Sequence, residues 1–464
     1  MIVDCGANVI SNVKIRGAEL ALSFTANEVH LQNVEVSNSV TALSLQASNA
    51  SLQLSDCRFY GNQYVLNAAQ NMWHVNVSSC VFKRNQRALQ LRDAQFVGIV
   101  DSQFSDNTYC LYSSVSYGLQ VNVSSSVFRR NYHVVWLDRA SFVGVVDSQF
   151  SDNSQSFSTR YNALFMKRSR FDDDAVVMTA KLAFIEDCVF NSSTLRVGAY
   201  YRPLLISVTN STFNSSRIQT SSRGLNLSIV GSSFRRMVYQ QQAVVDLSAS
   251  YLDSAVISDN VFEENSGSPC IRVNVPAISG FIKPGNLSIV GNRFTNHSDS
   301  NVVVINDRAY HRVQLKRNVF HNPLCPFEIE VQSPWLSGYA VNSSENWWGS
   351  ANRTYMAERV SDFFIDSKKA QVSITSIYTD PEMAQLEVIP DPRMWNVTDG
   401  KVVGGQLDRN VTLTNSTVPY LVSKTIYIPK RFYLYLEGNV TMHFAENRGV
   451  VVEGEFIIEF SSNR

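Results

Sequence analysis

Three consecutive carboxylates, Asp172-Asp173-Asp174, flanked by Arg168 and Arg170, are the residues of this sequence best suited to chemistry. Enzymes that cleave or epimerise acidic polysaccharides need clustered carboxylates for acid–base work or for calcium, with a basic group that neutralises the sugar acid. Successive residues of a strand point to opposite faces, so three in a row suit a turn better than a shared site. Asp152 and Asp187 are the carboxylates that could approach from neighbouring repeats. We interpret the run as a solvated turn and assign no catalytic residue.

The histidines and cysteines show no metal-ligand spacing. The seven cysteines are scattered and include no CxxC pair, which argues against a zinc site and against a dense disulfide framework. Cys57 and Cys80 fall one repeat apart, and parallel strands would aim both side chains the same way, so we expect free, buried thiols. We expect no metal and no cofactor. The seven histidines are His30, His74, His133, His297, His311, His321 and His443.

Asn-x-Ser/Thr sequons are more frequent than chance alone gives in a chain rich in Asn and Ser. Such an excess favours a secreted or cell-surface glycoprotein, because these sites are glycosylated only on the secretory route. The candidate glycosylation sites are Asn49, Asn76, Asn122, Asn191, Asn210, Asn214, Asn226, Asn286, Asn296, Asn342, Asn352, Asn396, Asn410, Asn415 and Asn439.

Composition excludes several classes of function. The 464 residues carry 40 basic and 40 acidic side chains, so there is no net charge to attract nucleic acid or an anionic membrane. No run of 18 apolar residues occurs, so this chain has no predicted transmembrane span. The first residues, MIVDCGANVI, lack the basic and apolar segments of a signal peptide. If the protein is extracellular, we therefore expect the chain to be a fragment of a longer one.

A repeat of about 22 residues must position all of these side chains. Each repeat ends in a small residue, one residue, Phe, two residues and Asn, as in SCVFKRN from Ser79 and DSQFSDN from Asp101. Val36 and Ile15 hold the same place in the first repeats. The Phe residues of the repeat are Phe59, Phe82, Phe104, Phe128, Phe150, Phe171, Phe190, Phe213, Phe234, Phe262, Phe294 and Phe320, after which Trp347 is expected to close the series.

The repeat predicts an all-β fold. VNVSSCVFKRN from Val75 recurs as VNVSSSVFRRN from Val121, 46 residues later, so a unit of two repeats was duplicated in tandem. Apolar residues alternate within each repeat, which is the period of a strand, and the Leu pattern of leucine-rich repeats is missing. We therefore predict a right-handed, pectate-lyase-like parallel β-helix of about fifteen coils.

Stacked coils would place equivalent residues in ladders. The position two before each Phe is small, as in Cys57, Cys80 and Ser102, and its parity predicts an inward ladder beside an inward Phe. The position three after each Phe is Asn62, Asn85, Asn107, Asn131 and Asn153, with Asp174 next. We expect these Asn residues to adopt the left-handed backbone of a turn and to bond amide to amide between coils.

The predicted domains are a β-helix over residues 1–350, a capping segment and linker over 351–393, and the opening coils of a second β-helix over 394–464. SSENWWGSANR from Ser343 is expected to plug the first β-helix. AERVSDFFIDS from Ala357 is the one plausible helix, with Val360, Phe363 and Phe364 on one face. Pro381 to Pro392 reads as the linker. Alternation resumes from Tyr420.

The chain resembles the β-helix modules of bark beetle-type proteins, which are large animal epithelial surface proteins. The resemblance rests on the Phe-x-x-Asn coils, on NWWG at Asn346–Gly349, and on PYLVSKTIYIP…LYLEGNVTMHF…GVVVEGEF; Glu437-Gly438 stands where family versions usually carry Pro-Gly. It implies a segment of a membrane-anchored protein that acts at epithelial cell–cell junctions. It implies no catalytic residue.

We therefore expect a non-catalytic extracellular segment with a structural or adhesive role, at the cell junction or secreted. Its expected partners are other cell-surface proteins or glycans, and not nucleic acid. The alternative is a carbohydrate-active β-helix enzyme, such as a polysaccharide lyase, hydrolase or epimerase, or a glycan-binding module. A groove lined by carboxylates from three adjacent coils, with a basic residue in it, would favour that alternative.

Overall fold

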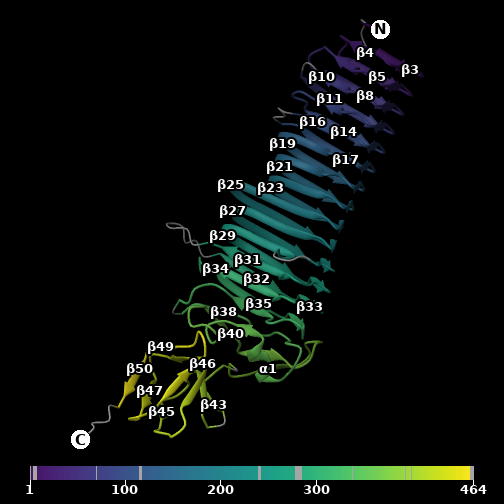
Figure 1. The fold of residues 1–464 in the computed structure, drawn as a ribbon. Helices are drawn as coiled ribbons and strands as arrows, with labels where there is room; N and C mark the ends of the chain where they lie inside the picture. The colour runs from purple at the N-terminus through teal and green to yellow at the C-terminus, as the bar shows by residue number, and fades with distance from the viewer. Residues whose placement is uncertain are drawn as a thin grey trace. The chain divides into compact units, whose positions relative to one another are not determined.

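The computed structural model describes residues 2–3, 8–68, 71–113, 118–238, 242–276, 285–336, 338–391, 393–398 and 400–459. The chain divides into two compact units, which are described separately. Unit 1 comprises Met1–Met237 and Asp246–Ala249, and unit 2 comprises Val238–Val245 and Ser250–Arg464. In each unit, strands of successive coils pair in parallel, so the predicted all-β parallel β-helix is confirmed (Figure 1). No helix among the described residues is long and apolar enough to cross a bilayer.

Each early coil of unit 1 carries three strands. The first is a three-residue strand with Phe, or its equivalent, at the centre, and these strands form the short-strand sheet. They are β3 (Lys14–Arg16), β6 (Glu35–Ser37), β9 (Arg58–Tyr60), β12 (Val81–Lys83), β15 (Gln103–Ser105), β18 (Val127–Arg129), β20 (Gln149–Ser151), β22 (Arg170–Asp172), β24 (Val189–Asn191), β26 (Thr212–Asn214) and β28 (Ser233–Arg235).

Two longer strands follow in each coil and build two further faces. The first long face consists of β1 (Ile2–Val3), β4 (Leu20–Phe24), β7 (Thr41–Leu45), β10 (Tyr64–Ala68), β13 (Arg87–Gln90) and β16 (Tyr109–Ser113). The second long face consists of β2 (Asn8–Ser11), β5 (Glu28–Gln32), β8 (Ala50–Ser55), β11 (Met72–Ser78), β14 (Phe96–Val100) and β17 (Gln120–Ser124).

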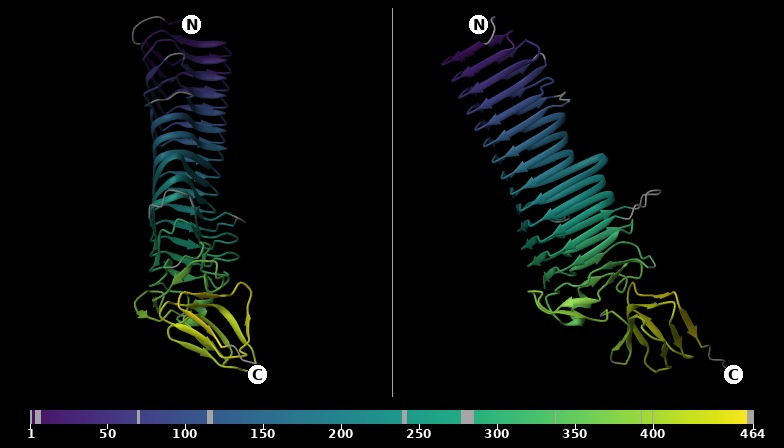
Figure 2. Two further views of the ribbon diagram at one scale, coloured as in Figure 1. Left: turned by 90° about the vertical axis from the view of Figure 1, so that its left-hand side faces the viewer. Right: turned by 180° about the vertical axis from the view of Figure 1, so that it is seen from behind.

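From His133 onward the two long faces are joined, because one strand continues from the first into the second. Figure 2 shows these strands stacked beside one another. The continuous strands of unit 1 are β19 (His133–Val146), β21 (Gln155–Lys167), β23 (Ala175–Glu186), β25 (Thr194–Thr209) and β27 (Arg217–Val230).

The Phe ladder forms the spine of the core, as its parity predicted. In unit 1 every ladder Phe is at most 1% exposed, and neighbouring rings stack with centroids 4.5 Å apart for Phe82–Phe104 and 5.2 Å for Phe59–Phe82. Val36 pairs with both Ile15 and Phe59, so the first repeats follow the predicted register. Stacked offset rings gain attraction beyond their buried area, which favours one aromatic residue per coil.

The small-residue ladder is also inward and hydrogen-bonded. Ser102 N–H donates to Ser126 Oγ at 3.1 Å, and Ser126 N–H donates to Ser148 Oγ at 3.2 Å. The ladder residues of unit 1 are buried from Cys57 and Cys80 to Ser232. Each hydroxyl thus satisfies a backbone N–H one coil away, which a larger apolar side chain would leave unpaired.

The Asn ladder bonds between coils as predicted, but its expected backbone conformation is wrong. Asn85 Nδ2 and Asn85 N–H both donate to Asn107 Oδ1, at 3.0 and 2.9 Å, and Asn85 Nδ2 also donates to Phe59 O. The left-handed residue is one earlier, as at Arg84 (φ 56°) and Asp106 (φ 59°). A residue in that conformation turns the chain there, and this turn aims the next side chain, the Asn, into the core.

Unit 2 continues the same coil plan with longer connections. Its short strands are β30 (Val261–Glu263), β33 (Arg293–Thr295) and β36 (Val319–His321), so the short-strand sheet has fourteen strands among the described residues, close to the expected fifteen coils. The other strands are β29 (Val245–Ser258, whose residues from Ser250 belong to unit 2), β31 (Ile271–Val275), β32 (Asn286–Val290), β34 (Val303–Asp307), β35 (Arg312–Lys316), β37 (Ile329–Val331), β38 (Ala340–Asn342), β39 (Val360–Ser361) and β40 (Gln371–Ser373).

Trp348, not Trp347, closes the Phe series. Val319 pairs with Trp347, so Phe320 is in register with Trp348, which is fully buried with its ring 5.3 Å from that of Phe320. Asn346 Oδ1 accepts from Asn318 Nδ2 at 3.0 Å and so continues the small-residue ladder two positions earlier. The expected Trp347 was therefore wrong by one residue.

The predicted helix from Ala357 is also wrong in place. The helix is α1 (Arg353–Glu358), and Asn352 caps it by accepting from the backbone N–H groups of Thr354 and Tyr355. Val360 begins strand β39, while Phe363 and Phe364 are buried in turns. The apolar spacing of this segment fits a helix, but pairing of Val360 with Ile329 of the preceding coil prevails.

The predicted restart of a β-helix is confirmed over residues 402–458. Parallel strands in two sheets surround a separate core that includes Trp395, Val403 and Leu434, and we call residues 394–459 the C-terminal module. Its strands, and the hairpin before it, are β41 (Ser376–Tyr378), β42 (Leu386–Val388), β43 (Asn396–Thr398), β44 (Val402–Gln406), β45 (Val411–Leu413), β46 (Tyr420–Ile428), β47 (Tyr433–Leu436), β48 (Met442–Phe444), β49 (Val450–Val452) and β50 (Glu455–Ile458). The domain limits at 350 and 393 stay predictions.

The segment read as a linker ends in a buried ionic contact. Arg393 is 1% exposed, and its guanidinium contacts Asp362 Oδ2 at 2.5 Å and Asp391 Oδ1 at 2.8 Å. Asp362 also accepts from the N–H groups of Val372 and Phe364. Within unit 2, this arginine therefore ties the C-terminal module to the end of the first β-helix.

Candidate functional site

The three consecutive carboxylates lie in three different environments. Asp172 pairs with Arg170, with Nε 2.7 Å from Oδ2, and Asp173 is exposed with a left-handed backbone. Asp174 is 3% exposed and occupies the Asn ladder, where Oδ1 accepts from Asn153 N–H and from Ser156 Oγ. The interpretation as a solvated turn is therefore confirmed for Asp173 alone, because Asp172 ends strand β22 and Asp174 is part of the core.

Burial sets the ionisation of Asp174. Desolvation raises the pKa of its carboxyl to about 7, although the hydrogen bonds from Ser156 and Asn153 oppose this shift. The group faces the ladder and not solvent, so its raised pKa has a structural cause. The same value at an open cleft would suggest an acid–base catalyst, but no substrate can reach this carboxyl.

The other candidate residues, Arg168, Asp152 and Asp187, were placed near the three carboxylates from the sequence. Arg168 forms a bidentate pair with Asp147, at 2.7 and 2.8 Å. Asp152 lies 3.7 Å from Arg129, and Asp187 sits at the turn before its short strand, the opposite end from Asp152. Asp152 and Asp173 hold equivalent positions in adjacent coils, whereas Asp174 is buried in the Asn ladder and Asp187 lies at the other end of the short strand.

Cysteines and histidines form no site in the described part of the chain. Cys57, Cys80, Cys110, Cys188, Cys270 and Cys325 are free and buried, as expected for the first two, while Cys5 lies outside the described residues. No group of three His, Cys, Asp or Glu among the described residues could hold a metal. His311 is fully buried, with Nδ1 2.9 Å from Asp307 Oδ1 and Nε2 accepting from Leu252 N–H, so this pair joins two segments of unit 2.

The most distinctive surface feature of unit 1 was not predicted from the sequence. Two columns of side chains follow the first long face, at the fifth and eighth residues after the Phe of each coil. The first column is Leu20, Thr41, Tyr64, Arg87, Tyr109 and His133, and the second is Ser44, Asn67, Gln90, Tyr112 and Trp136. We call Tyr64, Arg87, Tyr109, Tyr112, Tyr132, His133 and Trp136 the aromatic face. The constant offsets were the available signal, but the residue types vary from coil to coil.

The rings of the aromatic face stack on one another. Tyr112 and Trp136 are 4.6 Å apart at 17°, and Tyr109 and His133 are 4.9 Å apart at 18°. One face of each of these rings is therefore covered by a neighbouring ring, and the ring edges lie toward solvent. Tyr132 meets His133 edge-on and is 57% exposed.

Arg87 lies among these rings as the cation of the face. Its guanidinium carbon is 4.7 Å from the ring centroid of Tyr112, 5.6 Å from that of Tyr64 and 5.7 Å from that of Tyr109. Its NH1 donates to Gln90 Oε1 at 2.8 Å, but its buried Nε has no partner. Cation–π contacts of this kind hold the guanidinium in place without neutralising it.

His133 is neutral within the aromatic face. Desolvation lowers the pKa of its imidazole, so the ring is uncharged at neutral pH. Its Nδ1 is buried without a partner. Within the described residues, the hydroxyls of Tyr64, Tyr109 and Tyr112 form no hydrogen bond. The aromatic face therefore offers unused polar atoms at the edges of apolar rings.

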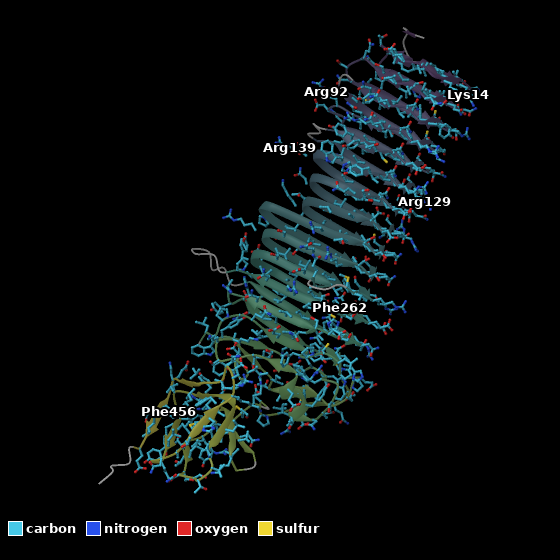
Figure 3. All side chains as sticks on the ribbon, viewed as in Figure 1. Lys14, Arg92, Arg129, Arg139, Phe262 and Phe456 are labelled. Carbon is cyan, nitrogen blue, oxygen red and sulfur yellow. The ribbon has the colours of Figure 1, made fainter. Side chains whose placement is uncertain are left out.

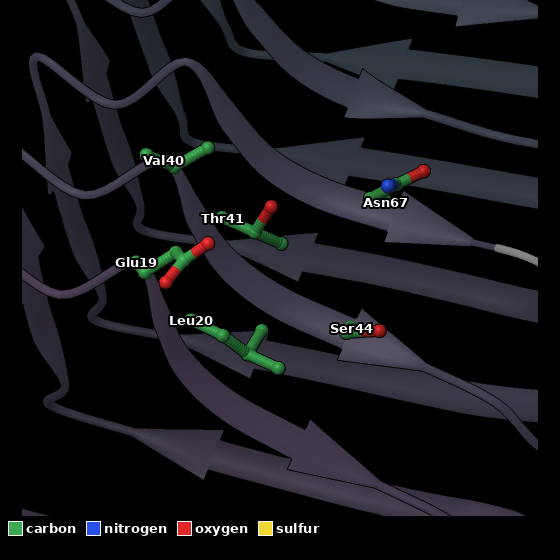
Figure 4. Close-up of a pocket in the computed structure, with 6 residues that line it drawn as sticks. All are labelled: Glu19, Leu20, Val40, Thr41, Ser44 and Asn67. Atoms are coloured by element: carbon green, nitrogen blue, oxygen red, sulfur yellow. The ribbon is translucent and has the colours of Figure 1, made fainter.

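An open groove of 680 Å³ extends the first long face beyond the aromatic residues. Figure 4 shows its lining from three neighbouring coils, and Thr41 and Asn67 belong to the two columns described above. The lining residues are Glu19, Leu20, Val40, Thr41, Ser44 and Asn67. The groove has one carboxylate and no basic group in its lining, so it is not the acidic cleft with a basic residue that the enzyme alternative requires.

The candidate glycosylation sites of unit 1 avoid the first long face. Asn76, Gly98 and Asn122 are successive partners in register, so the two sequons share the second long face, as predicted. Asn226 lies on the same face, Asn191 and Asn214 lie in the short-strand sheet, and Asn49 and Asn210 lie at turns. Across the chain, twelve of the fifteen sequon side chains are exposed, and Asn191, Asn214 and Asn342 are half-buried.

Comparisons with known proteins agree with the fold. Residues 1–154 match the family model described as "Right handed beta helix region". The chain is 24% identical over 149 residues to "Protein bark beetle" of Drosophila melanogaster, and this match covers 31% of the chain but 5% of that protein. No solved structure matches the chain significantly. The chain is thus similar to a small part of one much longer curated relative.

Proposed function

We propose that this chain is a non-catalytic extracellular segment of a large cell-surface protein, with a structural or adhesive role at epithelial cell–cell junctions. The observation that carries the proposal is that the repeated positions of the coils have structural roles. The Phe, Ser and Asn positions form inward ladders between coils, and Asp174 of the carboxylate run is buried in one of these ladders. A regular stack of sheets provides surface of fixed shape, which suits contact better than turnover.

Placement outside the cell is supported by the exposed sequons. An Asn side chain must be accessible to carry a glycan in the folded protein, and Asn76 and Asn122 project from the second long face. The chain then belongs on the extracellular side of the plasma membrane or is secreted. Partners at that location are other cell-surface proteins or glycans.

The junctional role is supported by the resemblance to bark beetle-type proteins and by the partial similarity to "Protein bark beetle". That protein is far longer than the matched segment. Its full activity and its partners are therefore part of this proposal and not of the comparison.

Incubation with polysaccharides tests the proposal that the chain is non-catalytic. Purified chain is incubated with pectin, alginate and animal glycosaminoglycans, and chain length and uronate epimer content are followed over several days. We expect no change. Cleavage or epimerisation by the wild type, lost when Asp172, Asp173 and Asp174 are all changed to Asn, would establish the enzyme instead.

The location is tested in epithelial cells. The gene is tagged at its endogenous locus within the sequence described here, and the tag is stained without permeabilising the membrane. We expect signal along cell–cell contacts. A tag seen only after permeabilisation, or spread evenly over the cell surface, would contradict the junctional proposal.

A further inference from the structure

We propose that the aromatic face of unit 1 is a docking site for a polypeptide segment that presents an acidic side chain between apolar ones. The inference rests on the proposed adhesive function and adds to it the face and the class of partner. Residue type, ring orientation, charge and the placement of sequons support it independently.

The residue types are those that dominate protein–protein contacts. Tyr, Trp and Arg are enriched at the centres of such interfaces because each combines a large apolar area with a polar end. Tyr112, Trp136 and Arg87 form one contacting group in the middle of the aromatic face. Tyr132, which is 57% exposed, stands beside it.

Ring orientation favours a polypeptide over a sugar. A sugar binds aromatic residues by laying its C–H face on an open ring face, and here Tyr112 covers one face of Trp136 and Tyr109 covers one face of His133. The ring edges carry positive partial charge, which attracts carbonyl and carboxylate oxygens. Backbone carbonyls and acidic side chains therefore fit these edges better than a pyranose does.

The positive charge of Arg87 favours an acidic partner segment. Arg87 is the one fully charged residue in the two columns from Thr41 to Trp136, which hold no carboxylate. Its Nε is buried, but among the described residues its Nη2 forms no hydrogen bond, so the Nη2 donors are left for an incoming oxygen. A guanidinium held between rings binds a carboxylate strongly because both groups are partly removed from water.

Glycans at the sequons of unit 1 would leave the aromatic face uncovered. Glycans at Asn76, Asn122 and Asn226 would cover the second long face. No sequon lies on a strand of the first long face in the described part of unit 1. A glycoprotein that must contact another protein needs such an uncovered surface. Figure 3 shows this side of unit 1 near the Arg92 and Arg139 labels, opposite Lys14 and Arg129 of the short-strand sheet.

The test uses a displayed library of random 12-residue peptides, selected on the full glycosylated chain. We expect enrichment of peptides with Asp or Glu between aliphatic or aromatic residues. Their affinity should fall at least about tenfold for Tyr112→Ser/Trp136→Ser, since two central aromatic residues commonly carry that much binding energy. Trp73→Ser is the matched control, because Trp73 is 48% exposed but lies on β11 of the second long face.

A charge reversal separates docking from loss of structure. Arg87→Glu should lose the acidic peptides and enrich peptides with Lys or Arg at the same place, which a merely unfolded face would not do. The thermal midpoint of every variant is compared with that of the wild type.

Three results would overturn the proposal. Selected peptides could bind Tyr112→Ser/Trp136→Ser as well as the wild type. Heparin, chondroitin sulfate or hyaluronan could bind this face while no peptide is enriched, which would assign it to glycans. Self-association that is lost in the same variant would assign it to a second copy of the chain. Each result leaves the polysaccharide and localisation tests of the proposed function unaffected.

Discussion

Asp174 is the one carboxylate in a ladder of amides, and its burial makes stability depend on pH. Burial raises the pKa of the Asp174 carboxyl in the folded state to about 7 from its ordinary value of 3.8, so the folded state binds more protons than the unfolded state between these values. The stabilising contribution is complete below about pH 4 and is lost as pH rises through about 7. Asp174→Asn removes this loss and completes the ladder. We expect the variant's advantage in free energy of unfolding to grow by about 2 kcal/mol from pH 5 to pH 8 in urea titrations.

Asp173→Asn is the control for this prediction. Asp173 is exposed, and Asn tolerates its left-handed backbone of φ 52°. Its pH profile should match that of the wild type. A parallel profile for Asp174→Asn, offset by a constant amount, would show that the Asp174 carboxyl does not titrate in this range.

Phe104 tests the spine of the core at the residue scale. Its ring stacks 4.5 Å from Phe82 and 4.9 Å from Phe128, and it is fully buried. Phe104→Ala should lower the free energy of unfolding by about 3–5 kcal/mol, because the coils above and below hold the cavity open. Denaturant titration measures this loss. Replacement of the exposed Tyr132 by Ala serves as control and should change stability by less than about 1 kcal/mol.

At the scale of elements, the duplicated two-coil unit alternates basic and acidic residues at one turn. The turn after the short strand carries Arg84, Asp106, Arg130 and Asp152 in successive coils. Arg130 Nε lies 2.7 Å from Asp106 Oδ1, and this pair lowers the pKa of the Asp106 carboxyl. Each exposed pair contributes only about 0–1 kcal/mol. Opposite charges are therefore adjacent within the duplicated coils, whereas the next coil places Asp173 beside Asp152.

Arg393 is expected to decide how firmly the C-terminal module is held. Arg393→Ala leaves Asp362 buried without its cation, which should cost about 3–5 kcal/mol. Burial already raises the pKa of Asp362, and loss of the arginine removes the opposing influence, so the cost should be smaller in acid. Hydrogen exchange should accelerate in residues 394–459 while the Phe ladder of unit 1 keeps its protection.

Arg409→Ala is the matched control within the same module. Arg409 is 66% exposed and pairs with Asp408 at 3.3 Å, so its loss should leave exchange unchanged. Equal acceleration in both variants would mean that the module opens independently of the buried contact at Arg393.

The fold was readable from the sequence because inward positions repeat in residue type. The Phe, small-residue and Asn positions follow one register, and the structure differs from it at Trp348 by one residue. α1 was misplaced because Val360, Phe363 and Phe364 have helical spacing, yet strand pairing and burial in turns satisfy them as well. The spacing of apolar residues within one segment does not show whether a strand of the preceding coil is available for pairing.

The aromatic face could not be recognised in the same way. Its members share constant offsets from each Phe, but Tyr64, Arg87, Tyr109 and His133 have no residue type in common. Outward positions need not repeat chemically, because solvent accepts any polar group. The dispersal of Asp172, Asp173 and Asp174, in contrast, followed directly from strand alternation.

At the scale of the whole molecule, glycan occupancy should follow exposure. Asn76 and Asn122 are exposed, and we expect both to be modified when the chain passes through the secretory pathway of animal cells. Asn191 Nδ2 donates to Asp172 at 2.6 Å and Asn214 Nδ2 donates to Asn191 at 2.9 Å, so a glycan there would disturb a ladder. Peptide mapping after glycosidase treatment should show lower occupancy at Asn191 and Asn214. A secreted product with no glycan at all would remove the main support for an extracellular location.

The ladders also determine how unit 1 would respond to mechanical load. Each coil is bonded to its neighbours by the same set of contacts, such as the shared acceptor Asn107 Oδ1 for Asn85. Tension that unwinds the chain from one end would load the contacts of one coil at a time. Each released coil of about 22 residues lengthens the chain by about 75 Å, since an extended residue spans at most about 3.3–3.6 Å. Near-identical rungs would then yield at near-identical forces, and unit 1 would act as an extensible tether that absorbs work in many equal steps.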